Sequence, residues 1–193
     1  MKTMIDSLEA QKIISQRRDD AVIVATMTAN FEWSQVSTNP DLDLMLSGAM
    51  GKASSLGLGV ALARPSRKVI VLDGDGSLLM NLGSLVTIAS LSPANLIHFV
   101  FENSVYRTTG GQLVPGAAKV SFSELARAAG YARVHEFEDL KSLEDNLEAL
   151  LNDTGPAFVC LKIIPAYERS PFPLTTTRKV VSRFREALKR SSP

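Results

Sequence analysis

The sequence predicts an open α/β fold in which helices cover both faces of a mostly parallel β-sheet. Apolar runs of strand length alternate along the chain with segments that have a helical pattern. These runs are apolar throughout, as strands are when a sheet is buried on both faces. A glycine-rich turn, Gly74-Asp75-Gly76-Ser77, follows one of the runs. Open α/β sheets bind ligands at the carboxyl ends of their strands, so this turn marks a candidate site.

The first part of the chain alternates helices with short strands. The segment Ile5 to Arg17 has a helical pattern, and Met50 to Ala63 is rich in Ala, Leu and small residues, as in a tightly packed helix. Strands are expected at Ala21 to Ala25, Leu44 to Leu46 and Val69 to Leu72. All three strands are free of charged residues, which suits interior positions.

The same alternation continues to the end of the chain. The glycines Gly110 and Gly111 belong to a long loop, and this loop and the stretch Pro165 to Pro173 are the two segments expected to be mobile. The remaining expected elements are a helix from Ser77 to Ser90, a strand Leu96 to Phe101, a loop from Ser104 to Lys119, a helix Phe122 to Ala129, a strand Ala132 to Phe137, a helix Leu140 to Leu151, a strand Ala157 to Ile163 and a helix Thr175 to Lys189.

Composition limits the classes of ligand. The 193 residues are enough for one domain with a sizeable core. Apolar residues make up 45% and charged residues 21%, the balance of an ordinary globular protein. A net charge of +1 gives no electrostatic reason to expect nucleic acid or an anionic membrane as a partner. Any charged ligand must therefore be held by a local arrangement.

Cysteine and histidine usage points to structural roles. The single cysteine, Cys160, lies in an apolar run and has no intrachain disulfide partner. His98 lies inside an apolar strand and His135 near a strand end, so we expect neither to act in acid–base catalysis. The N-terminus lacks the apolar core of a secretion signal, and no stretch approaches a membrane span. These features favour a reducing, cytoplasmic compartment.

The turn around Asp75 has the chemistry of half a metal-diphosphate site. A carboxylate between two glycines is presented to a hard cation, while the glycines let backbone N–H groups approach phosphate oxygens. A helix starting at Ser77 adds its positive N-terminal end to the same anion. Asn103, 28 residues after Asp75 and at the end of the next strand, brings an amide oxygen. In isolation, an Asp-Gly pair is also ordinary turn chemistry.

Two other glycine motifs do not support nucleotide binding. The segment from Gly48 to Ser54 resembles a P-loop, but Leu46 replaces the first required glycine and Ala53 replaces the hydroxyl residue after the lysine. Gly57-Leu58-Gly59 lacks the third glycine of a dinucleotide fingerprint and lies inside an expected helix. We interpret these glycines as aids to close packing.

A family resemblance rests on four short segments: Gly48-Ala49-Met50-Gly51, Gly74-Asp75-Gly76-Ser77, Glu102-Asn103-Ser104-Val105-Tyr106 and Thr109-Gly110-Gly111-Gln112. Together they resemble the diphosphate-binding domain of thiamine-diphosphate-dependent 2-oxo-acid decarboxylases. Within this family, the chain looks most like the sulfopyruvate decarboxylase beta subunit and the C-terminal half of phosphonopyruvate decarboxylase, over Ala21 to Ile164. It implies a thiamine-diphosphate-binding fold, with residues 1–193 as a single diphosphate-binding (PP-type) domain and a C-terminal helical extension from about 175.

The resemblance also implies residue roles. Asp75 and Asn103 would bind magnesium through their side chains and Val105 through its carbonyl, with two diphosphate oxygens and one water completing six ligands. Met50 would bend the cofactor, and the carbonyl of Gly48 would accept a hydrogen bond from its aminopyrimidine. The residues that would contact the diphosphate are Thr26, Thr28, Gly74, Gly76 and Ser77.

Three positions depart from the family pattern, and two cations are candidates for substrate binding. Glu102 stands where relatives often have asparagine, and Met27 stands where glycine is common. Glu102 is either a solvated strand-end charge or a group that perturbs the site. Arg107 replaces a residue that is often acidic in relatives. Lys52 and Arg107 are the candidates to meet a sulfonate or phosphonate, with a solvated surface charge as the alternative for each.

The resemblance further implies that the chain needs a partner. About 45 residues precede Gly48, too few for the pyrimidine-binding domain of this family, which supplies an activating glutamate. We therefore expect a separate alpha subunit, a dimer of heterodimers, and no catalytic residue in this chain. The expected reaction converts sulfopyruvate to sulfoacetaldehyde and carbon dioxide, with the loop Ser104 to Pro115 closing over the site.

Several alternatives remain open at this stage. Within the thiamine enzymes, they are a phosphonopyruvate decarboxylase and an acetohydroxyacid-synthase-like subunit that condenses two oxo acids. A non-catalytic regulatory module that binds the cofactor or a partner is another. A different α/β protein, in which Asp75 occupies a purely structural turn, would show no magnesium-dependent cofactor binding.

Overall fold

The fold is built on a six-stranded parallel sheet. The computed structural model describes residues 4–117, 119–165 and 176–190. The sheet has the strand order β2-β1-β3-β4-β8-β7, and all its neighbouring strands pair in parallel. This confirms the expected open, mostly parallel sheet. The strands are β1 (Val22–Thr26), β2 (Asp43–Leu46), β3 (Val69–Gly74), β4 (Leu96–Glu102), β7 (Arg133–Phe137) and β8 (Ala157–Lys162).

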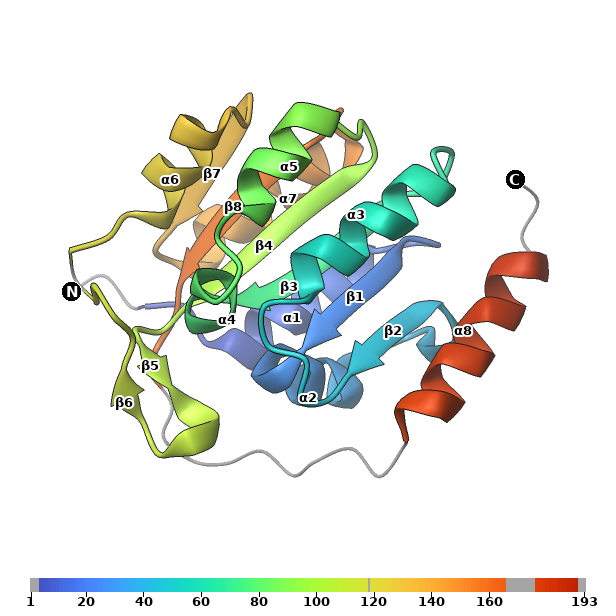
Figure 1. Cartoon of the computed structure of the whole chain (residues 1–193), viewed down its shortest axis with the longest axis horizontal. Helices are drawn as coiled ribbons and strands as arrows, with labels where there is room; N and C mark the ends of the chain where they lie inside the picture. The colour runs from blue at the N-terminus through green and yellow to red at the C-terminus, as the bar shows by residue number, and fades with distance from the viewer. Residues whose placement is uncertain (1–3, 118, 166–175, 191–193) are drawn as a thin grey trace.

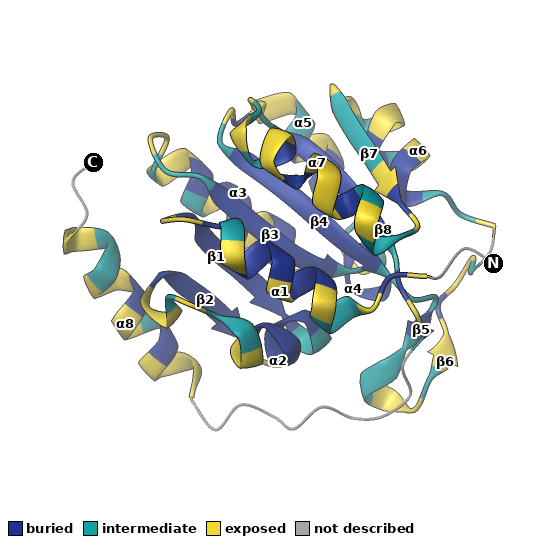
Figure 2. Ribbon diagram, turned by 180° about the vertical axis from the view of Figure 1, so that it is seen from behind, coloured by how far each residue is buried: buried dark blue, intermediate teal, exposed yellow. Residues whose placement is uncertain are grey.

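Helices cover both faces of this sheet. In Figure 1, α3 (Ala53–Ala63), α5 (Ser84–Leu91) and α6 (Phe122–Ala129) lie in front of the strands. On the opposite face, which Figure 2 shows, lie α1 (Ser7–Arg17), α2 (Met27–Val36) and α7 (Leu140–Asn152). Other helical elements are α4 (Asp75–Leu79), α8 (Thr177–Arg190), which lies beside the edge strand β2, and the 3-10 turn η1 (Pro40–Leu42).

The core runs along the centre of the sheet. Phe99 on β4, Phe158 on β8 and Ile70 on β3 are fully buried, because helices exclude water from both sides of these strands. The central strands are accordingly dark blue in Figure 2, whereas the edge strand β7 is mostly half-buried. Cys160, on β8, is also fully buried. Burial on both faces explains why the strands are apolar throughout.

Two expected helices have different bounds in the structure. The helix expected from Met50 begins at Ala53, because Gly48 and Gly51 adopt positive φ angles of 71° and 72° in the preceding turn. The helix expected from Ser77 to Ser90 begins at Asp75 and is divided into α4 and α5. Around Met80 the backbone switches to i→i+3 hydrogen bonds, with N···O distances of 3.1 and 2.9 Å, which end the first piece.

One helix and one hairpin were not predicted from the sequence. No helix was expected where α2 lies. The loop expected from Ser104 to Lys119 contains an antiparallel hairpin of β5 (Val105–Tyr106) and β6 (Gln112–Leu113), joined by the 3-10 turn η2 (Arg107–Thr109). Gly110 and Gly111 reverse the chain there with φ angles of 117° and 79°. The stretch from Pro165 to Pro173 was expected to be mobile. Its residues from 166 on lie outside the described part of the chain.

Packing explains one of the glycines inside α3. A Cβ atom at Gly57 would lie 2.2 Å from the Cγ2 atom of Val71, so only glycine allows α3 to approach β3 this closely. This confirms the packing interpretation for Gly57, whereas the space around Gly59 is open. Across residues 4–117, 119–165 and 176–190, no helix has the length and apolar character needed to cross a membrane.

Candidate functional site

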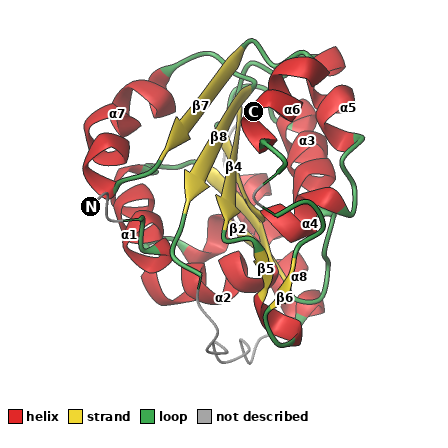
Figure 3. Cartoon of the chain, turned by 90° about the vertical axis from the view of Figure 1, so that its left-hand side faces the viewer, coloured by secondary structure: helices red, strands yellow, loops and turns green. Residues whose placement is uncertain are grey.

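A cavity opens at the carboxyl edge of the sheet, where β1, β3 and β4 end. In Figure 3 the arrowheads of the parallel strands point toward the side on which β5 and β6 lie. The cavity has a volume of about 270 Å³ and is lined by the turns that follow these three strands. The lining includes Thr26, Thr28, Met50, Gly74, Asp75, Gly76, Ser77, Asn103, Val105 and Arg107. The structure therefore brings together most of the residues that the sequence singled out.

Asp75 lies at the start of α4 as a buried carboxylate. Its Oδ1 atom accepts a hydrogen bond from the backbone N–H of Gly76 at 2.8 Å, and its Oδ2 atom accepts one from Ser104 at 2.7 Å. The pKa of Asp75 is raised to about 6: burial is the largest cause, the charge of Glu102 adds to the rise, and hydrogen bonds from backbone N–H groups oppose it. A counter-ion would therefore stabilise the ionised form of this buried carboxylate.

The turn after the next strand brings two more residues, Asn103 and Val105, to the same cavity. Asn103 follows β4, and its Oδ1 atom accepts a hydrogen bond from the N–H of Val105 at 2.9 Å. Ser104 between them has a φ angle of 63°, which turns the chain sharply. One carboxylate, one amide and one peptide carbonyl are the hard oxygen donors that Mg²⁺ prefers.

Protein side chains alone do not complete a metal site here. No group of three or more His, Cys, Asp or Glu residues able to hold a metal occurs in the described part of the chain. A cation beside Asp75 would therefore need oxygens from elsewhere, such as those of a phosphate ligand and water. The donor set fits a magnesium ion that is shared with a bound diphosphate.

A second part of the cavity favours an anion. The helix α2 begins directly after Thr26, so its first peptide N–H groups face the cavity end of β1. The residue Thr26 is 1% exposed, and its Oγ1 atom has no hydrogen-bond partner, although this residue is the N-cap of α2. A buried hydroxyl without a partner beside a helix N-terminus is the arrangement that a phosphate oxygen would satisfy.

The turn after β3 leaves little room for side chains. A Cβ atom at Gly76 would lie 2.4 Å from Cε1 of Tyr106, so glycine is required while that ring covers the turn. Ser77 accepts a hydrogen bond on its Oγ atom from the N–H of Gly51 at 3.0 Å. This bond connects the turn before α3 with the start of α4. Gly48, by contrast, does not line the cavity.

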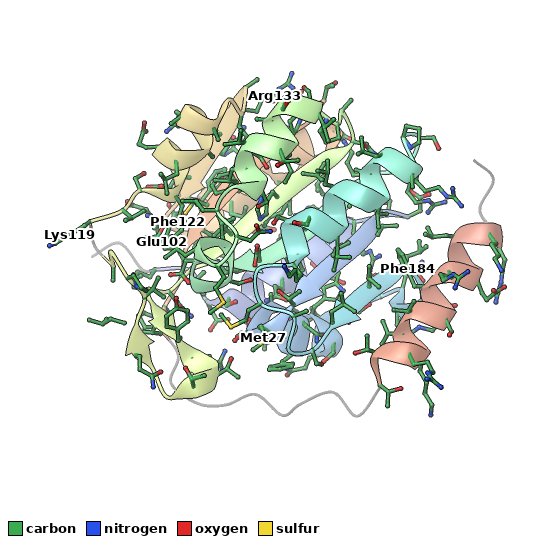
Figure 4. The ribbon with its side chains drawn as sticks, viewed as in Figure 1. Met27, Glu102, Lys119, Phe122, Arg133 and Phe184 are labelled. Atoms are coloured by element: carbon green, nitrogen blue, oxygen red, sulfur yellow. The ribbon has the colours of Figure 1, made fainter. Side chains whose placement is uncertain are left out.

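Met27 and Met50 add apolar surface to the cavity wall, together with Met80. Met27 has a φ angle of 51°, in the left-handed region that glycine adopts without strain. A glycine would adopt this backbone conformation more readily than Met27 does. Figure 4 labels Met27 at the carboxyl edge of the sheet.

The two candidate substrate cations lie in different environments. Arg107 lines the cavity, and its Nη1 atom lies 2.5 Å from Oε1 of Glu32. Lys52 is exposed and lies outside the cavity lining. Glu32 was missed in the sequence because it lies in α2, where no helix was expected. The i,i+4 spacing of the buried residues Ala29 and Trp33 was the available signal for that helix.

Glu102 is not a solvated strand-end charge. Its Oε2 atom accepts hydrogen bonds from Nζ of Lys162 at 2.6 Å and from Sγ of Cys160 at 3.1 Å. The residue lies at the end of β4 (Figure 4). Burial, followed by the nearby Glu102 carboxylate, raises the pKa of the Cys160 thiol. Glu102 therefore links β4 to β8 and adds negative charge near Asp75.

The histidines occupy different environments. His98 is fully buried on β4, with its Nε2 atom 3.5 Å from Oδ2 of Asp73 and its ring edge-on to Phe158. His135 lies on β7, where burial, opposed by the Asp153 charge, lowers its pKa. Neither histidine lines the cavity. The structure places no imidazole against the candidate site.

The fold and the site define a class: an α/β protein that can hold an anion and a hard cation together at the carboxyl edge of its sheet. Residues 25–161 match the family described as "Thiamine pyrophosphate enzyme, C-terminal TPP binding domain". This match covers most of the sequence. The chain therefore belongs to this family.

Relatives with curated names fall into two sizes. The chain is 39% identical over 184 residues to a phosphonopyruvate decarboxylase of Streptomyces viridochromogenes, covering 95% of this chain but 45% of that protein. It is 36% identical over 182 residues to the sulfopyruvate decarboxylase subunit beta of Methanothermobacter thermautotrophicus, covering 94% of both chains. The chain thus spans less than half of the first relative and nearly all of the second.

Solved structures show the same fold. A thiamine diphosphate-dependent 4-hydroxybenzoylformate decarboxylase of Rhodococcus jostii RHA1 matches with a TM-score of 0.69 and 21% identity, covering 87% of this chain and 34% of that chain. A putative thiamin diphosphate-dependent enzyme from Mycobacterium smegmatis matches with a TM-score of 0.67 and 22% identity, covering 85% and 32%. At these identities the likeness concerns the fold.

Proposed function

We propose that this chain is the beta, diphosphate-binding subunit of a decarboxylase that depends on thiamine diphosphate and Mg²⁺. The observation that carries the proposal is that Asp75, Asn103 and Val105 line the same cavity as the residues at the N-terminus of α2. Cation-binding oxygens and anion-binding peptide groups lie side by side there. A metal-bound diphosphate requires this combination.

The residues of this chain act by binding and orienting. Asp75, Asn103 and the carbonyl of Val105 would hold the magnesium ion, and Met50, which also lines the cavity, would support the cofactor. The hydroxyl of Thr26 would donate to a diphosphate oxygen and so gain the partner that it lacks. Thiamine diphosphate, when bound, supplies an electron sink for the pair released when a 2-oxo acid loses carbon dioxide. The other residues proposed to contact the cofactor are Thr28, Gly48, Gly74, Gly76 and Ser77.

We propose that a separate, pyrimidine-binding alpha subunit completes the site, in a dimer of heterodimers. A sulfopyruvate decarboxylase of Methanosarcina acetivorans, 27% identical, is covered to 45% by this chain, whereas the proteins named subunit beta are covered almost completely. In this proposal, the part of the Methanosarcina protein that this chain does not cover corresponds to the partner subunit. We also propose a single domain over residues 1–193, with α8 in a C-terminal extension, and a cytoplasmic location.

One face of the molecule supports this partnership. The helices α3 and α5 lie next to each other in front of the sheet (Figure 1), and they carry no Lys, Arg, Asp or Glu between Ala53 and Ala63 or between Ser84 and Leu91. Large apolar side chains on or beside this face are exposed, among them Leu62 (51%), Val86 (58%) and Met80 (59%). Met80 also lines the cavity, so a subunit on this face would reach the edge of the site.

The proposed substrate is sulfopyruvate, which would yield sulfoacetaldehyde and carbon dioxide. The similarity to two proteins named sulfopyruvate decarboxylase subunit beta, at 36% and 34% identity, favours this substrate. Phosphonopyruvate is the second candidate, because the higher identity, 39%, is to a phosphonopyruvate decarboxylase. The two substrates differ in the acidic group attached to the same 2-oxo acid skeleton.

Reconstitution tests the proposal. The chain is co-expressed with the polypeptide encoded beside it, supplied with Mg²⁺ and thiamine diphosphate, and assayed with sulfopyruvate, phosphonopyruvate and pyruvate. We expect an aldehyde and carbon dioxide from sulfopyruvate, and none from the chain alone. A condensed hydroxy acid as product would instead favour an acetolactate-synthase-like reaction. Full decarboxylase activity of the isolated chain would overturn the need for a partner.

A further inference from the structure

Glu32 has a set of contacts that the proposed cofactor site does not explain. This buried carboxylate on α2 is 6% exposed and lines the cavity. Its Oε2 atom accepts hydrogen bonds from Oγ of Ser7 at 2.5 Å and from Nε2 of Gln11 at 2.8 Å, both on α1. Its Oε1 atom lies 2.5 Å from Nη1 of Arg107. Three donors from two other parts of the chain therefore meet on one carboxylate.

Arg107 belongs to the hairpin of residues 104–113, which forms one side of the cavity. The first residues of the hairpin are held at the metal end of the site, where the N–H of Ser104 donates to Asp75 at 2.7 Å. The ring of Tyr106 packs on Gly76. Arg107 reaches the other wall and pairs with Glu32 there. The hairpin is thus attached both to the turn after β3 and to α2.

We propose that Glu32 and Arg107 form a latch that holds the hairpin against the cavity, so that Ser104 and Val105 keep their positions beside Asp75. Part of this inference, the effect on the cofactor, rests on the proposed function. Both residues act as positioning residues through the hairpin. The Arg107 and Glu32 side chains are 13% and 8% exposed, so loss of either partner leaves a poorly solvated charge.

Hydrogen bonds from α1 hold the Glu32 carboxylate in place for its ion pair with Arg107. Ser7 and Gln11 hold the Oε2 atom, which sets the orientation of the carboxylate independently of the hairpin. A surface ion pair between two long, mobile side chains lacks this support and contributes little. An acidic group of a substrate could use Arg107 only in competition with this pre-oriented carboxylate.

Amide hydrogen exchange and cofactor binding test the latch in the full chain. The variants are Glu32→Gln, Arg107→Gln and Arg107→Lys, with Arg127→Gln as the matched control, since Arg127 pairs with Glu124 at an exposed site. We expect the Gln variants to speed exchange in residues 104–113 about tenfold or more, with unchanged exchange in β3. The dissociation constant of thiamine diphosphate with Mg²⁺, measured by titration calorimetry, should rise about tenfold.

The remaining variants separate a positioning role from a general loss of structure. Arg107→Lys keeps the charge and should recover part of both effects, Arg127→Gln should show neither, and the double variant Glu32→Gln/Arg107→Gln should be no worse than Arg107→Gln alone. Unchanged exchange in the hairpin of Arg107→Gln would overturn the latch. Faster exchange with unchanged cofactor affinity would overturn its positioning role. If the unmodified chain bound no thiamine diphosphate even together with its alpha subunit, the proposed function would fail, while the exchange comparison would still decide on the latch.

Discussion

Replacing Thr26 with valine should have opposite effects on stability and on cofactor binding. The change removes a buried hydroxyl that has no hydrogen-bond partner and keeps the branched shape of the side chain. An unsatisfied buried hydroxyl costs about 1–3 kcal/mol, so its removal should stabilise the cofactor-free chain. No capping bond is lost, because Thr26 makes no side-chain bond to α2.

The expected sizes follow from these contacts. A gain of about 1–2 kcal/mol corresponds to a rise in Tm of about 2–8 °C for a chain of this length. A hydrogen bond from the hydroxyl to a charged diphosphate oxygen is worth about 1.5–3 kcal/mol, so its loss should weaken cofactor binding about 10–100-fold. Scanning calorimetry without cofactor gives the first value, and titration calorimetry with Mg²⁺ and thiamine diphosphate gives the second.

Thr28→Val is the matched control for stability. Thr28 also lines the cavity but is only half-buried, and its hydroxyl is not among the buried atoms without a partner. We therefore expect no gain in Tm from this variant. A lower Tm for Thr26→Val would show that the hydroxyl already has a partner in the cofactor-free protein. Unchanged cofactor affinity would remove Thr26 from the site.

Three further predictions concern the metal end of the site and its surroundings. Asp75→Ala and Asn103→Ala should each weaken Mg²⁺-dependent binding of thiamine diphosphate about 100-fold or more, because each removes one oxygen ligand; equal affinities of both variants and the unmodified chain in the same titration would refute the metal assignment. Because the pKa of Asp75 is raised to about 6, a proton occupies the carboxylate below that pH and competes with the cation. Cofactor affinity should thus be constant above about pH 7 and fall about tenfold per unit below pH 6, and titrations from pH 5 to 8 that gave a flat profile would contradict this. Because burial raises the pKa of Cys160, its thiol should stay unlabelled by iodoacetamide in the folded chain between pH 7 and 9 and react once urea unfolds the protein; mass spectrometry that finds rapid labelling of the folded chain would contradict this.

The sheet and the meeting of Asp75 with Asn103 were predictable from the sequence. Strands buried on both faces are uniformly apolar, and this pattern marked β1, β3, β4 and β8. Two carboxyl-terminal turns of neighbouring parallel strands meet at one edge, so ligands placed after β3 and β4 had to be close. Chain topology, more than residue propensity, made this part of the site predictable.

The helix α2 was not predictable by the same reasoning. Its buried residues include Asn30 and Glu32, so polar side chains interrupt the apolar face on which helical periodicity depends. The strands β5 and β6 have two residues each, too few for any period to show. Glu32 and Arg107 are 75 positions apart, and only the tertiary fold brings them together. The side of the cavity formed by α2 and the hairpin could therefore be recognised only in the structure.

Much of the anion-binding side of this cavity consists of peptide groups. The first N–H groups of α2 belong to the backbone, which a side-chain substitution does not delete. A survey of alanine variants would consequently report only the side-chain share of the site, such as that of Asp75, Asn103 and Thr26. The contribution of the backbone N–H groups to anion binding would be measured only by replacing a peptide amide with an ester. Among natural variants, it would allow different side chains at these positions as long as the backbone conformation stays the same.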